Sequence, residues 1–216
     1  MQPLFIVFEG IDGAGTTTQC NRLCERLRDA GHEIVQTREP GGTEAGEKIR
    51  ALLLDPAFAC LDHRAELLLY AACRRQLVAQ ILQPALSGHK PVISDRYTCS
   101  SLAYQGIARG LGLPLVRQIN AVATAGLDAD LTIFLDLDVH TALTRRNKRS
   151  GGVEDRMEQA GAGFQARVRE GYLELAREHP EKSLLLDAAE TEETLSLQVY
   201  KALISRFPHF PYRISA

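Results

Sequence analysis

The sequence predicts an α/β fold in which helices cover both faces of a doubly wound, five-stranded parallel sheet. Short apolar runs, typical of parallel strands that are covered on both faces, recur along the 216 residues. Segments with helical patterns separate these runs, as the crossover connections of a parallel sheet require. The hydrophobic fraction of 45% and the charged fraction of 24% suit a globular protein with one sizeable core.

The expected strands and helices alternate along the chain. The strands are expected at 4–9, 33–37, 91–94, 131–136 and 183–187. The helices are expected at 16–29, 43–54, 63–87, 98–108, 114–126, 138–147, 158–178 and 191–206. Gly31 and Gly88 end the first and third helices, because glycine accommodates the backbone turn at a helix C-terminus. Since no linker, repeat or low-complexity tract interrupts the series, we expect residues 1–216 to form a single domain.

The first strand leads into a loop that is suited to phosphate. Leu4–Phe8 is a nearly continuous apolar run, and the glycine-rich residues 10–17 (GIDGAGTT) follow it. Glycines let the backbone wrap around a phosphate with its N–H groups inward, and the next helix N-terminus adds partial positive charge. The usual pattern is G-x-x-x-x-G-K-[ST], so Thr17 supplies the magnesium-ligating hydroxyl but Thr16 stands where the lysine belongs. The alternative interpretation is an ordinary glycine-rich turn between a strand and a helix.

The second and third strands are followed by charged residues. Arg38 precedes a Pro-Gly-Gly turn, and Asp95 and Arg96 follow the strand at 91–94. Because ligands bind at the carboxyl ends of parallel strands, Arg38 and Arg96 are candidates to grip a second phosphate through bidentate guanidinium contacts. Asp95 is a candidate to hold magnesium, directly or through water. The alternative is a structural Asp–Arg ion pair with a surface arginine, but beside a phosphate loop these residues favour a phosphoryl-transfer site.

Composition and charge argue against other classes of protein. The net charge is −2, so no global basic field recruits nucleic acid. No apolar run approaches the roughly 20 residues of a membrane span, and the N-terminus has no basic region or cleavage site. We therefore expect no membrane partner and a cytoplasmic location. Five scattered cysteines, an odd number, are expected to be buried free thiols in a reducing compartment rather than metal ligands or redox pairs.

Five motifs follow one another along the chain. They are FEGIDGAG from Phe8, TREPGGT from Thr37, ISDRYTCSSLAYQ from Ile93, LDLD from Leu135 and DRMEQ from Asp155. In order and spacing they resemble bacterial thymidylate kinases, and the resemblance covers essentially the whole chain through the last helix. It implies a nucleoside monophosphate kinase of the P-loop type that phosphorylates dTMP to dTDP with Mg–ATP in dTTP biosynthesis. It also implies a homodimer packed through helices, and a small lid at about residues 145–156.

The resemblance implies a donor site in the phosphate loop. The ATP phosphates would be bound by Gly10, Ile11, Asp12, Gly13, Ala14, Gly15, Thr16 and Thr17. The ion Mg²⁺ would be held by Thr17 and Asp95. Asp12 also occupies a position at which the family has an acid near the acceptor nucleotide, so the resemblance implies a catalytic role for it.

The resemblance implies an acceptor site as well. Arg38 and Arg96 would bind the dTMP phosphate, and Arg96 would also act in catalysis. Tyr70 matches a position that phenylalanine usually holds and keeps an aromatic face for stacking on thymine. On the residues alone, a core aromatic on a helix face is the preferred interpretation of Tyr70. Arg74, one turn further along the same helix, would reach the base edge. The pocket would be completed by Ser101, Tyr104 and Gln105.

Thr16 departs from the family pattern. Losing one charge-stabilising group commonly costs about 2.7–4 kcal/mol, which corresponds to a hundred- to thousandfold in rate. In relatives whose loop lacks an extra arginine, as this one does at Ala14, the lid supplies it. The basic stretch 145–154 is predicted to be a mobile surface loop within that lid. We hypothesise that lid cations partly replace the lysine, with Arg149 and Arg156 as the leading catalytic candidates. The alternative is a solvated charge run.

Three functions stay open at this point. The intact acceptor motifs favour an active dTMP kinase. Thr16 favours a nucleotide-binding protein with little or no kinase activity, such as a sensor or a partner subunit. Tyr70 and Ser101 leave room for a kinase that acts on another nucleoside monophosphate.

Overall fold

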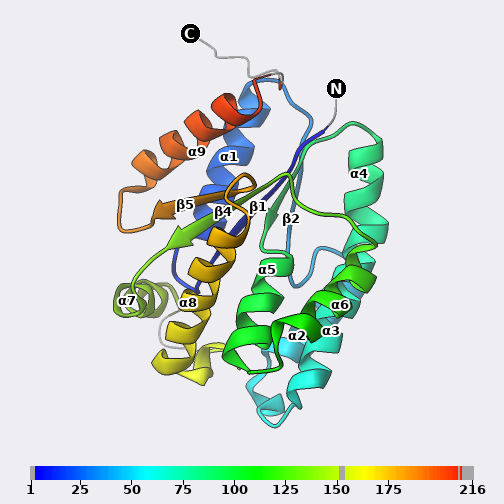
Figure 1. Cartoon of the computed structure of the whole chain (residues 1–216), viewed down its shortest axis with the longest axis vertical. Helices are drawn as coiled ribbons and strands as arrows, with labels where there is room; N and C mark the ends of the chain where they lie inside the picture. The colour runs from blue at the N-terminus through cyan, green and yellow to red at the C-terminus, as the bar shows by residue number, and fades with distance from the viewer. Residues whose placement is uncertain (1–2, 151–153, 209, 211–216) are drawn as a thin grey trace.

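A central parallel sheet organises the structure. The computed structural model describes residues 3–150, 154–208 and 210, without the side chains of residues 149 and 150. The strands are β1 (Phe5–Gly10), β2 (Val35–Arg38), β3 (Val92–Asp95), β4 (Leu131–Asp136) and β5 (Ser183–Asp187). All pairs are parallel, in the order β2-β3-β1-β4-β5 (Figure 1). The fold class and the five strands expected from the sequence are confirmed.

Helices connect the strands and cover both faces of the sheet. The α-helices are α1 (Thr16–Asp29), α2 (Glu44–Leu54), α3 (His63–Leu77), α4 (Gln83–Ser87), α5 (Thr98–Ser101), α6 (Leu113–Thr124), α7 (Val139–Ser150), α8 (Ala162–Glu178) and α9 (Glu192–Arg206). The 3₁₀ helices are η1 (Pro56–Phe58) and η4 (Glu158–Ala160), and the π-helical segments are η2 (Val78–Leu82) and η3 (Leu102–Ala108). Figure 1 shows α8 in front of the strands and α1 behind them, beside α9.

The helices differ from expectation at three places. The stretch predicted to be a loop from residue 145 is helical as far as Ser150, because arginine and lysine are good helix formers as well as surface residues. The helix expected at 158–178 begins as η4, and α8 starts only at Ala162, after Gly161 breaks the helix with a φ of 84°. The helices expected at 63–87 and 98–108 each contain a π-helical segment, η2 and η3 respectively.

The carboxyl ends of three strands lie side by side. In the sheet register, Phe8 of β1 and Arg38 of β2 both pair with Asp95 of β3. The loop that follows β1, the turn that follows Arg38 and the Asp95–Arg96 pair therefore meet at one edge of the sheet, where parallel α/β folds bind their ligands.

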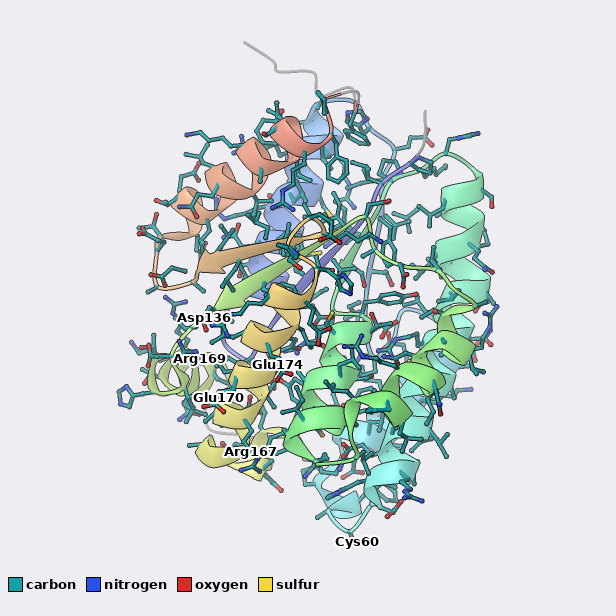
Figure 2. All side chains as sticks on the ribbon, in the orientation of Figure 1. Cys60, Asp136, Arg167, Arg169, Glu170 and Glu174 are labelled. Carbon is teal, nitrogen blue, oxygen red and sulfur yellow. The ribbon has the colours of Figure 1, made fainter. Side chains whose placement is uncertain are left out.

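Helix α8 is fastened to the sheet close to this edge. Arg169 donates to both carboxylate oxygens of Asp136, at 2.6 and 2.9 Å, and Figure 2 shows the pair where β4 meets α8. Gly171 allows close packing, because a Cβ at this position would lie 2.9 Å from the side chain of Ile107 in η3. The ring of Tyr172 consequently packs against Phe134 of β4, with 6.0 Å between ring centroids.

All five cysteines are free, but not all are buried as expected. Cys20, Cys24 and Cys73 are buried, Cys99 is partly buried, and Cys60 is exposed at the end of the molecule that Figure 2 shows lowest. Among the described residues, no helix is both long enough and apolar enough to cross a membrane.

Candidate active site

The loop after β1 borders a cavity of about 510 Å³. Gly13 and Gly15 both have a φ of 96°, which glycine adopts without strain. Helix α1 begins directly behind Gly15, and no side chain among the described residues caps it. Its first N–H groups and its dipole therefore favour an anion in the cavity. The cavity is lined by Gly13, Ala14, Gly15, Thr18, Gln19, Arg145, Arg146, Ala189, Glu190, Thr191, Glu192 and Leu195.

Helix α7 packs directly on this loop. A Cβ on Gly13 would collide with the carbonyl oxygen of Ala142. Arg146 stands one turn further along the same face of α7 and is only 2% exposed. Its Nη2 bonds to Glu154, whereas its Nη1 is buried with no acceptor among the described residues. Arg146 therefore has an unused donor in the wall of the cavity.

Thr17 and Asp95, the residues predicted to hold magnesium, lie in contact. Thr17 Oγ1 donates to Asp95 Oδ2 at 2.5 Å. The second carboxylate oxygen of Asp95 is buried and lacks a partner in the described part of the chain. A hydroxyl beside an orphaned carboxylate oxygen fits Mg²⁺, which prefers oxygen ligands and keeps several waters or phosphate oxygens of its own.

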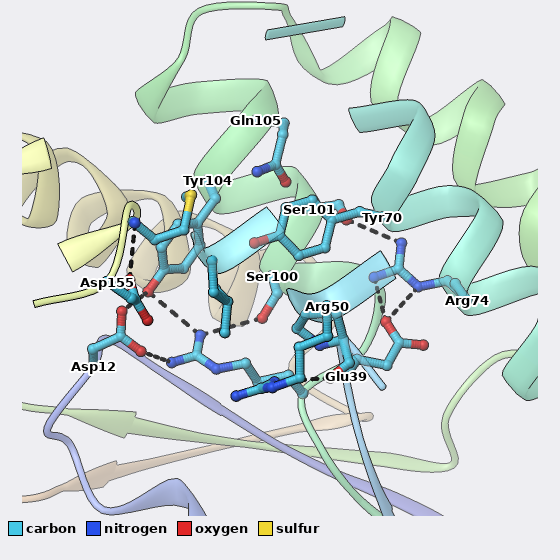
Figure 3. A pocket seen from close by; sticks show the side chains of 14 residues that line it. Asp12, Glu39, Arg50, Tyr70, Arg74, Ser100, Ser101, Tyr104, Gln105 and Asp155 are labelled. Atoms are coloured by element: carbon cyan, nitrogen blue, oxygen red, sulfur yellow. Dashed lines mark hydrogen bonds and ion pairs between the residues drawn. The ribbon is translucent and has the colours of Figure 1, made fainter. Parts of the chain in front are cut away.

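A second cavity, of about 100 Å³, adjoins the same loop (Figure 3). Its lining comes from the ends of β1, β2 and β3 and from helices α2, α3, α5 and η3, with two residues of the segment that follows α7. It comprises Asp12, Glu39, Pro40, Arg50, Leu54, Tyr70, Arg74, Arg96, Ser100, Ser101, Tyr104, Gln105, Asp155 and Met157. The structure thus brings together most of the residues that the sequence assigned to the acceptor.

Arg96 lies between an acid and three hydroxyl groups. Its Nη2 donates to Asp12 Oδ1 at 2.7 Å, and its Nη1 donates to Tyr172 Oη at 3.0 Å. The hydroxyls of Ser100 and Tyr104 each lie 3.4 Å from Nη1. Burial lowers the pKa of Arg96, but Tyr104, Tyr172 and Asp12 raise it by more, so its pKa lies well above the ordinary value. Arg96 also has a φ of 76°, a strained conformation of the kind that gathers at functional sites.

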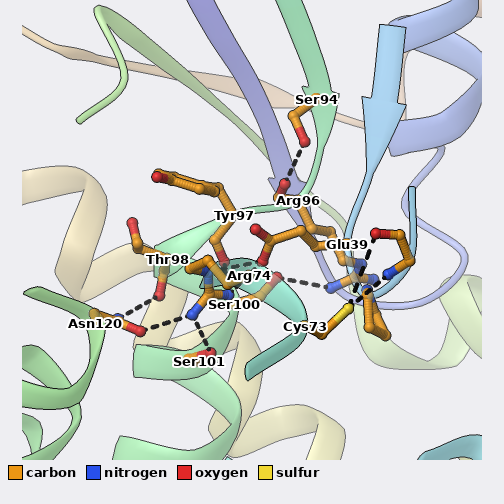
Figure 4. Close-up of polar contacts among 12 residues, drawn as sticks. Glu39, Cys73, Arg74, Ser94, Arg96, Tyr97, Thr98, Ser100, Ser101 and Asn120 are labelled. Carbon is orange, nitrogen blue, oxygen red and sulfur yellow. Dashed lines mark hydrogen bonds and ion pairs between the residues drawn. The ribbon is translucent and has the colours of Figure 1, made fainter. Parts of the chain in front are cut away.

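Arg74 makes four hydrogen bonds and one further ion-pair contact within the protein (Figure 4). Nε and Nη2 bond to Glu39 Oε2 at 2.8 and 2.5 Å. Nη1 donates to Ser101 Oγ at 3.0 Å and to Asn120 Oδ1 at 2.7 Å, and Nη2 donates to the carbonyl oxygen of Tyr97 at 2.9 Å. A hydrogen bond from Arg74 to a base edge, as predicted, therefore requires that one of these acceptors be exchanged.

The predicted lid arginines lie in different surroundings. Arg156 is buried, donates to the carbonyl oxygen of Leu53 at 2.7 Å and pairs with Glu66 at 2.6 Å. Gln105 donates to the same Glu66 at 2.8 Å, so this acid links the acceptor cavity to the segment after α7. Arg156 is absent from the lining of the phosphate-loop cavity as the described residues form it. Arg149 belongs to α7, but its side chain lies outside the described residues.

Arg50, rather than the predicted Arg38, lies in the lining of the acceptor cavity. Arg38 Nη2 donates to both oxygens of Glu47 at 2.9 Å, and its side chain is 51% exposed outside that lining. Arg50 donates to the carbonyl oxygen of Pro40 at 2.8 Å. Arg50 could not be singled out from the sequence, because it stands in the middle of a helix and belongs to none of the five motifs.

Two further residues missed from the sequence are Glu9 and Tyr172. Tyr172 contacts Arg96 from a helix far along the chain. Glu9 lies in β1 and is completely buried. Burial raises the pKa of Glu9 to about 7, although hydrogen bonds and the charge of Arg96 oppose the shift. An acid at the end of an otherwise apolar strand was the available signal for Glu9, whereas Tyr172 gave no sign beyond that of a core aromatic.

Comparison with known proteins gives one consistent result. The family model for thymidylate kinase matches residues 8–199. The chain is 50% identical to a thymidylate kinase of Deinococcus radiodurans, over 95% of this chain and 98% of that protein. It is 48% identical to one of Pelotomaculum thermopropionicum, over 94% and 93% of the two chains. The crystal structure of thymidylate kinase from Ehrlichia chaffeensis superposes with a TM-score of 0.74 at 33% identity, covering 94% of this chain and 99% of that one.

Proposed function

The chain belongs to the thymidylate kinase family, and from this premise we propose that its two cavities hold ATP and dTMP during phosphoryl transfer to dTMP. One observation carries the assignment of the cavities. Asp12 lines the smaller cavity, and the next residue, Gly13, lines the larger one. A single stretch of backbone therefore separates a site built for phosphate from a site that holds an arginine and an aromatic ring.

The larger cavity is assigned to ATP. The ATP phosphates would accept hydrogen bonds from the N–H groups of the loop from Gly10 to Gly15. They would also lie at the N-terminus of α1, which favours anions. Thr17 and Asp95 would hold Mg²⁺. When bound, the ion would neutralise part of the negative charge that develops on the phosphates during transfer.

The smaller cavity is assigned to dTMP. The Arg96 guanidinium, held by Asp12 at 2.7 Å, binds the acceptor phosphate. Tyr70 offers its ring to thymine, with Ser101, Tyr104 and Gln105 around the base and sugar. Arg50 supplies a second guanidinium from the lining. The predicted contact of Arg38 with this phosphate requires that Arg38 first leave Glu47.

The reaction is an in-line displacement. An oxygen of the dTMP phosphate attacks the γ-phosphorus of ATP, a new P–O bond forms, and the bond to the β–γ bridging oxygen breaks to release ADP. The protein contributes position and charge rather than covalent chemistry. Asp12 and Arg96 would keep the acceptor phosphate oriented at the loop that separates the two nucleotides.

We further propose that α7 or the segment that follows it supplies the cation that Thr16 does not. Arg149 and Arg156 are the leading candidates taken from the sequence, and Arg146 joins them because it lines the phosphate-loop cavity and its buried Nη1 has no acceptor among the described residues. The test is a double-mutant cycle of Arg146→Gln with Thr16→Lys. We expect Arg146→Gln to lower kcat roughly 100-fold in the original chain but much less in the Thr16→Lys background, because the introduced lysine then does the same work. Equal losses in both backgrounds would show that Arg146 is not the replacement.

A homodimer is proposed as the assembly. Leu68 of α3 and Val122 of α6 are 57% and 79% exposed, on two helices that pack together (Figure 1). Exposed apolar side chains on adjacent helices are typical of a subunit interface. Light scattering should give twice the chain mass of 23.8 kDa, and Leu68→Glu should return the monomer. A monomeric original chain would rule the dimer out.

The function as a whole is tested by steady-state ADP formation with Mg–ATP and dTMP, in the original chain and in Thr16→Lys. Turnover that depends on dTMP in the original chain supports the proposal. Activity in the Thr16→Lys variant alone would leave the cavity assignments intact but would mean that this chain binds the nucleotides without useful transfer.

A further inference from the structure

Glu9 is a buried carboxylate that the proposed reaction does not use. It stands next to last in β1, with no exposed surface. Alternation along the strand places it on the same face as Phe5 and Val7, and the sheet register sets it beside Phe134 of β4. No lysine or arginine of the described chain donates a hydrogen bond to it. Burying a carboxyl group without a cationic hydrogen-bond partner costs folding free energy. The hydrogen bonds that Glu9 does make therefore indicate its function.

Each oxygen of Glu9 accepts two hydrogen bonds. Oε1 accepts from the backbone N–H groups of Tyr97 and Ser100, at 2.9 and 3.1 Å. These are free donors at the start of α5, which lacks a side-chain cap from its own N-terminal residues. Oε2 accepts from Ser100 Oγ at 2.6 Å and from Tyr172 Oη at 3.0 Å. The first oxygen therefore caps a helix, while the second orders two hydroxyl groups.

The hydroxyls of Ser100 and Tyr172 lie between Glu9 and Arg96. An ionised carboxylate only accepts, so both hydroxyl protons turn toward Glu9. Each hydroxyl then presents a lone pair to the other side, where Arg96 Nη1 lies 3.0 Å from Tyr172 Oη and 3.4 Å from Ser100 Oγ. An arginine can only donate, so this orientation is the one that can hold it.

We propose that Glu9 is a positioning residue for the acceptor phosphate: by fixing the direction of the Ser100 and Tyr172 hydroxyl protons, it holds the Arg96 guanidinium at the edge of the acceptor cavity. The effect on dTMP rests on the proposed function, which assigns the dTMP phosphate to Arg96. The effect on Arg96 itself does not.

The arrangement depends on the ionisation of Glu9. A protonated Glu9 donates to one of the two hydroxyls, whose own proton then turns away from Glu9, either toward Arg96 or toward the other hydroxyl, 2.9 Å away; in both cases a lone pair that had been available to Arg96 is lost. Burial raises the pKa of Glu9 to about 7, so this change in the direction of the hydroxyl protons occurs in an experimentally accessible pH range. The titratable and charged groups that face Glu9 are Arg74 on α3, Arg96 and Tyr97 after β3, Cys99 on α5 and Tyr172 on α8.

Glu9→Gln tests the proposal, because the amide keeps the shape and one acceptor oxygen for α5 while its NH₂ group donates to the hydroxyls. At about pH 8.5 we expect kcat/KM for dTMP to fall roughly 10- to 100-fold, with the KM for ATP within about twofold of the original. The difference should shrink toward about pH 6, where Glu9 itself carries a proton. The second ionisation of the dTMP phosphate, near pH 6, is common to both proteins and cancels in the ratio.

Tyr172→Phe provides the matched control. Added to Glu9→Gln, it removes the hydroxyl proton that points at Arg96, so the double variant should recover at least about twofold over Glu9→Gln alone. Should Glu9→Gln fail to fold, Tyr172→Phe by itself is expected to lower kcat/KM for dTMP and leave the KM for ATP unchanged. A ratio of activities that does not vary with pH would overturn the proposal.

A crystal structure of Glu9→Gln without nucleotides separates this proposal from the proposed function. We expect Arg96 Nη1 to have moved beyond hydrogen-bond distance of Tyr172 Oη. An Arg96 that remains in place would overturn the positioning role whether or not the chain turns over dTMP. A displaced Arg96 in a chain that lacks dTMP turnover would support the role and contradict the function instead.

Discussion

Replacing Glu9 with glutamine should change how the stability of this protein depends on pH. The carboxyl group is completely buried, and burial raises its pKa from 4.5 to about 7. Between these values the folded protein keeps the proton and the unfolded chain releases it. The stability that this group contributes is therefore fully present below pH 4.5 and is lost as the pH rises through 7. The shift, 7 − 4.5 = 2.5 pKa units at about 1.4 kcal/mol each, amounts to about 3.5 kcal/mol over the whole range.

Urea unfolding followed by far-ultraviolet circular dichroism is the suitable assay, because the chain has no tryptophan. Between about pH 5 and about pH 8, the unfolding free energy of the original protein should fall by about 2–3 kcal/mol relative to that of Glu9→Gln. Other titrating groups are common to both proteins and cancel in the difference. Glu174→Gln, on the exposed face of α8, is the control and should show no such change. A difference between the original and Glu9→Gln that stays constant with pH would refute the reasoning.

Three further perturbations test other parts of the structure. Gly13→Ala should weaken ATP binding at least about tenfold in calorimetric titrations, because its Cβ would collide with a backbone carbonyl of α7 and its φ is 96°. Gly163→Ala, in open space on α8, should leave ATP binding unchanged, and equal effects of the two would contradict the close contact. Arg74→Lys should lower the unfolding free energy by roughly 3–5 kcal/mol in urea, since an ammonium group cannot replace all the buried hydrogen bonds of the guanidinium, and an unchanged urea midpoint would show that the network is dispensable. Arg50→Ala should raise the KM for dTMP about tenfold and Arg38→Ala less, and the reverse order would place the phosphate beside Arg38.

The sheet and its functional edge could be predicted because their signals are local. An apolar run followed by GIDGAG describes a strand, a loop and a helix start within a few residues. Three charged residues end a strand or directly follow one: Arg38, Asp95 and Arg96. Because the strands pair in parallel, their carboxyl ends lie at the same edge of the sheet and bring these residues together. Once strand ends were placed, the meeting of Thr17 with Asp95 needed no further information.

The partners of the site residues could not be predicted, because they depend on packing between distant segments. Tyr172 reaches Arg96 only because α8 is held on β4 by Arg169 and packs closely at Gly171. Arg156 has the charge expected of a lid residue, but Glu66, far earlier in the chain, binds it. Local sequence patterns do not predict how many hydrogen-bond acceptors surround a guanidinium group. That number decides whether the guanidinium is available to a substrate.

The loop at Asp12 and Gly13 forms a wall that the two cavities share, because Asp12 lines the smaller cavity and Gly13 lines the larger one. The binding of one nucleotide therefore affects the binding of the other. On one side Gly13 touches α7, and on the other Asp12 holds Arg96. A ligand that shifts this wall from either cavity changes the free energy of binding in the other. Thermodynamic linkage makes the effect reciprocal, so whatever factor ATP imposes on the affinity for dTMP, dTMP must impose on the affinity for ATP. The protein needs no distant allosteric site to make its two substrates cooperative, since one peptide segment serves both.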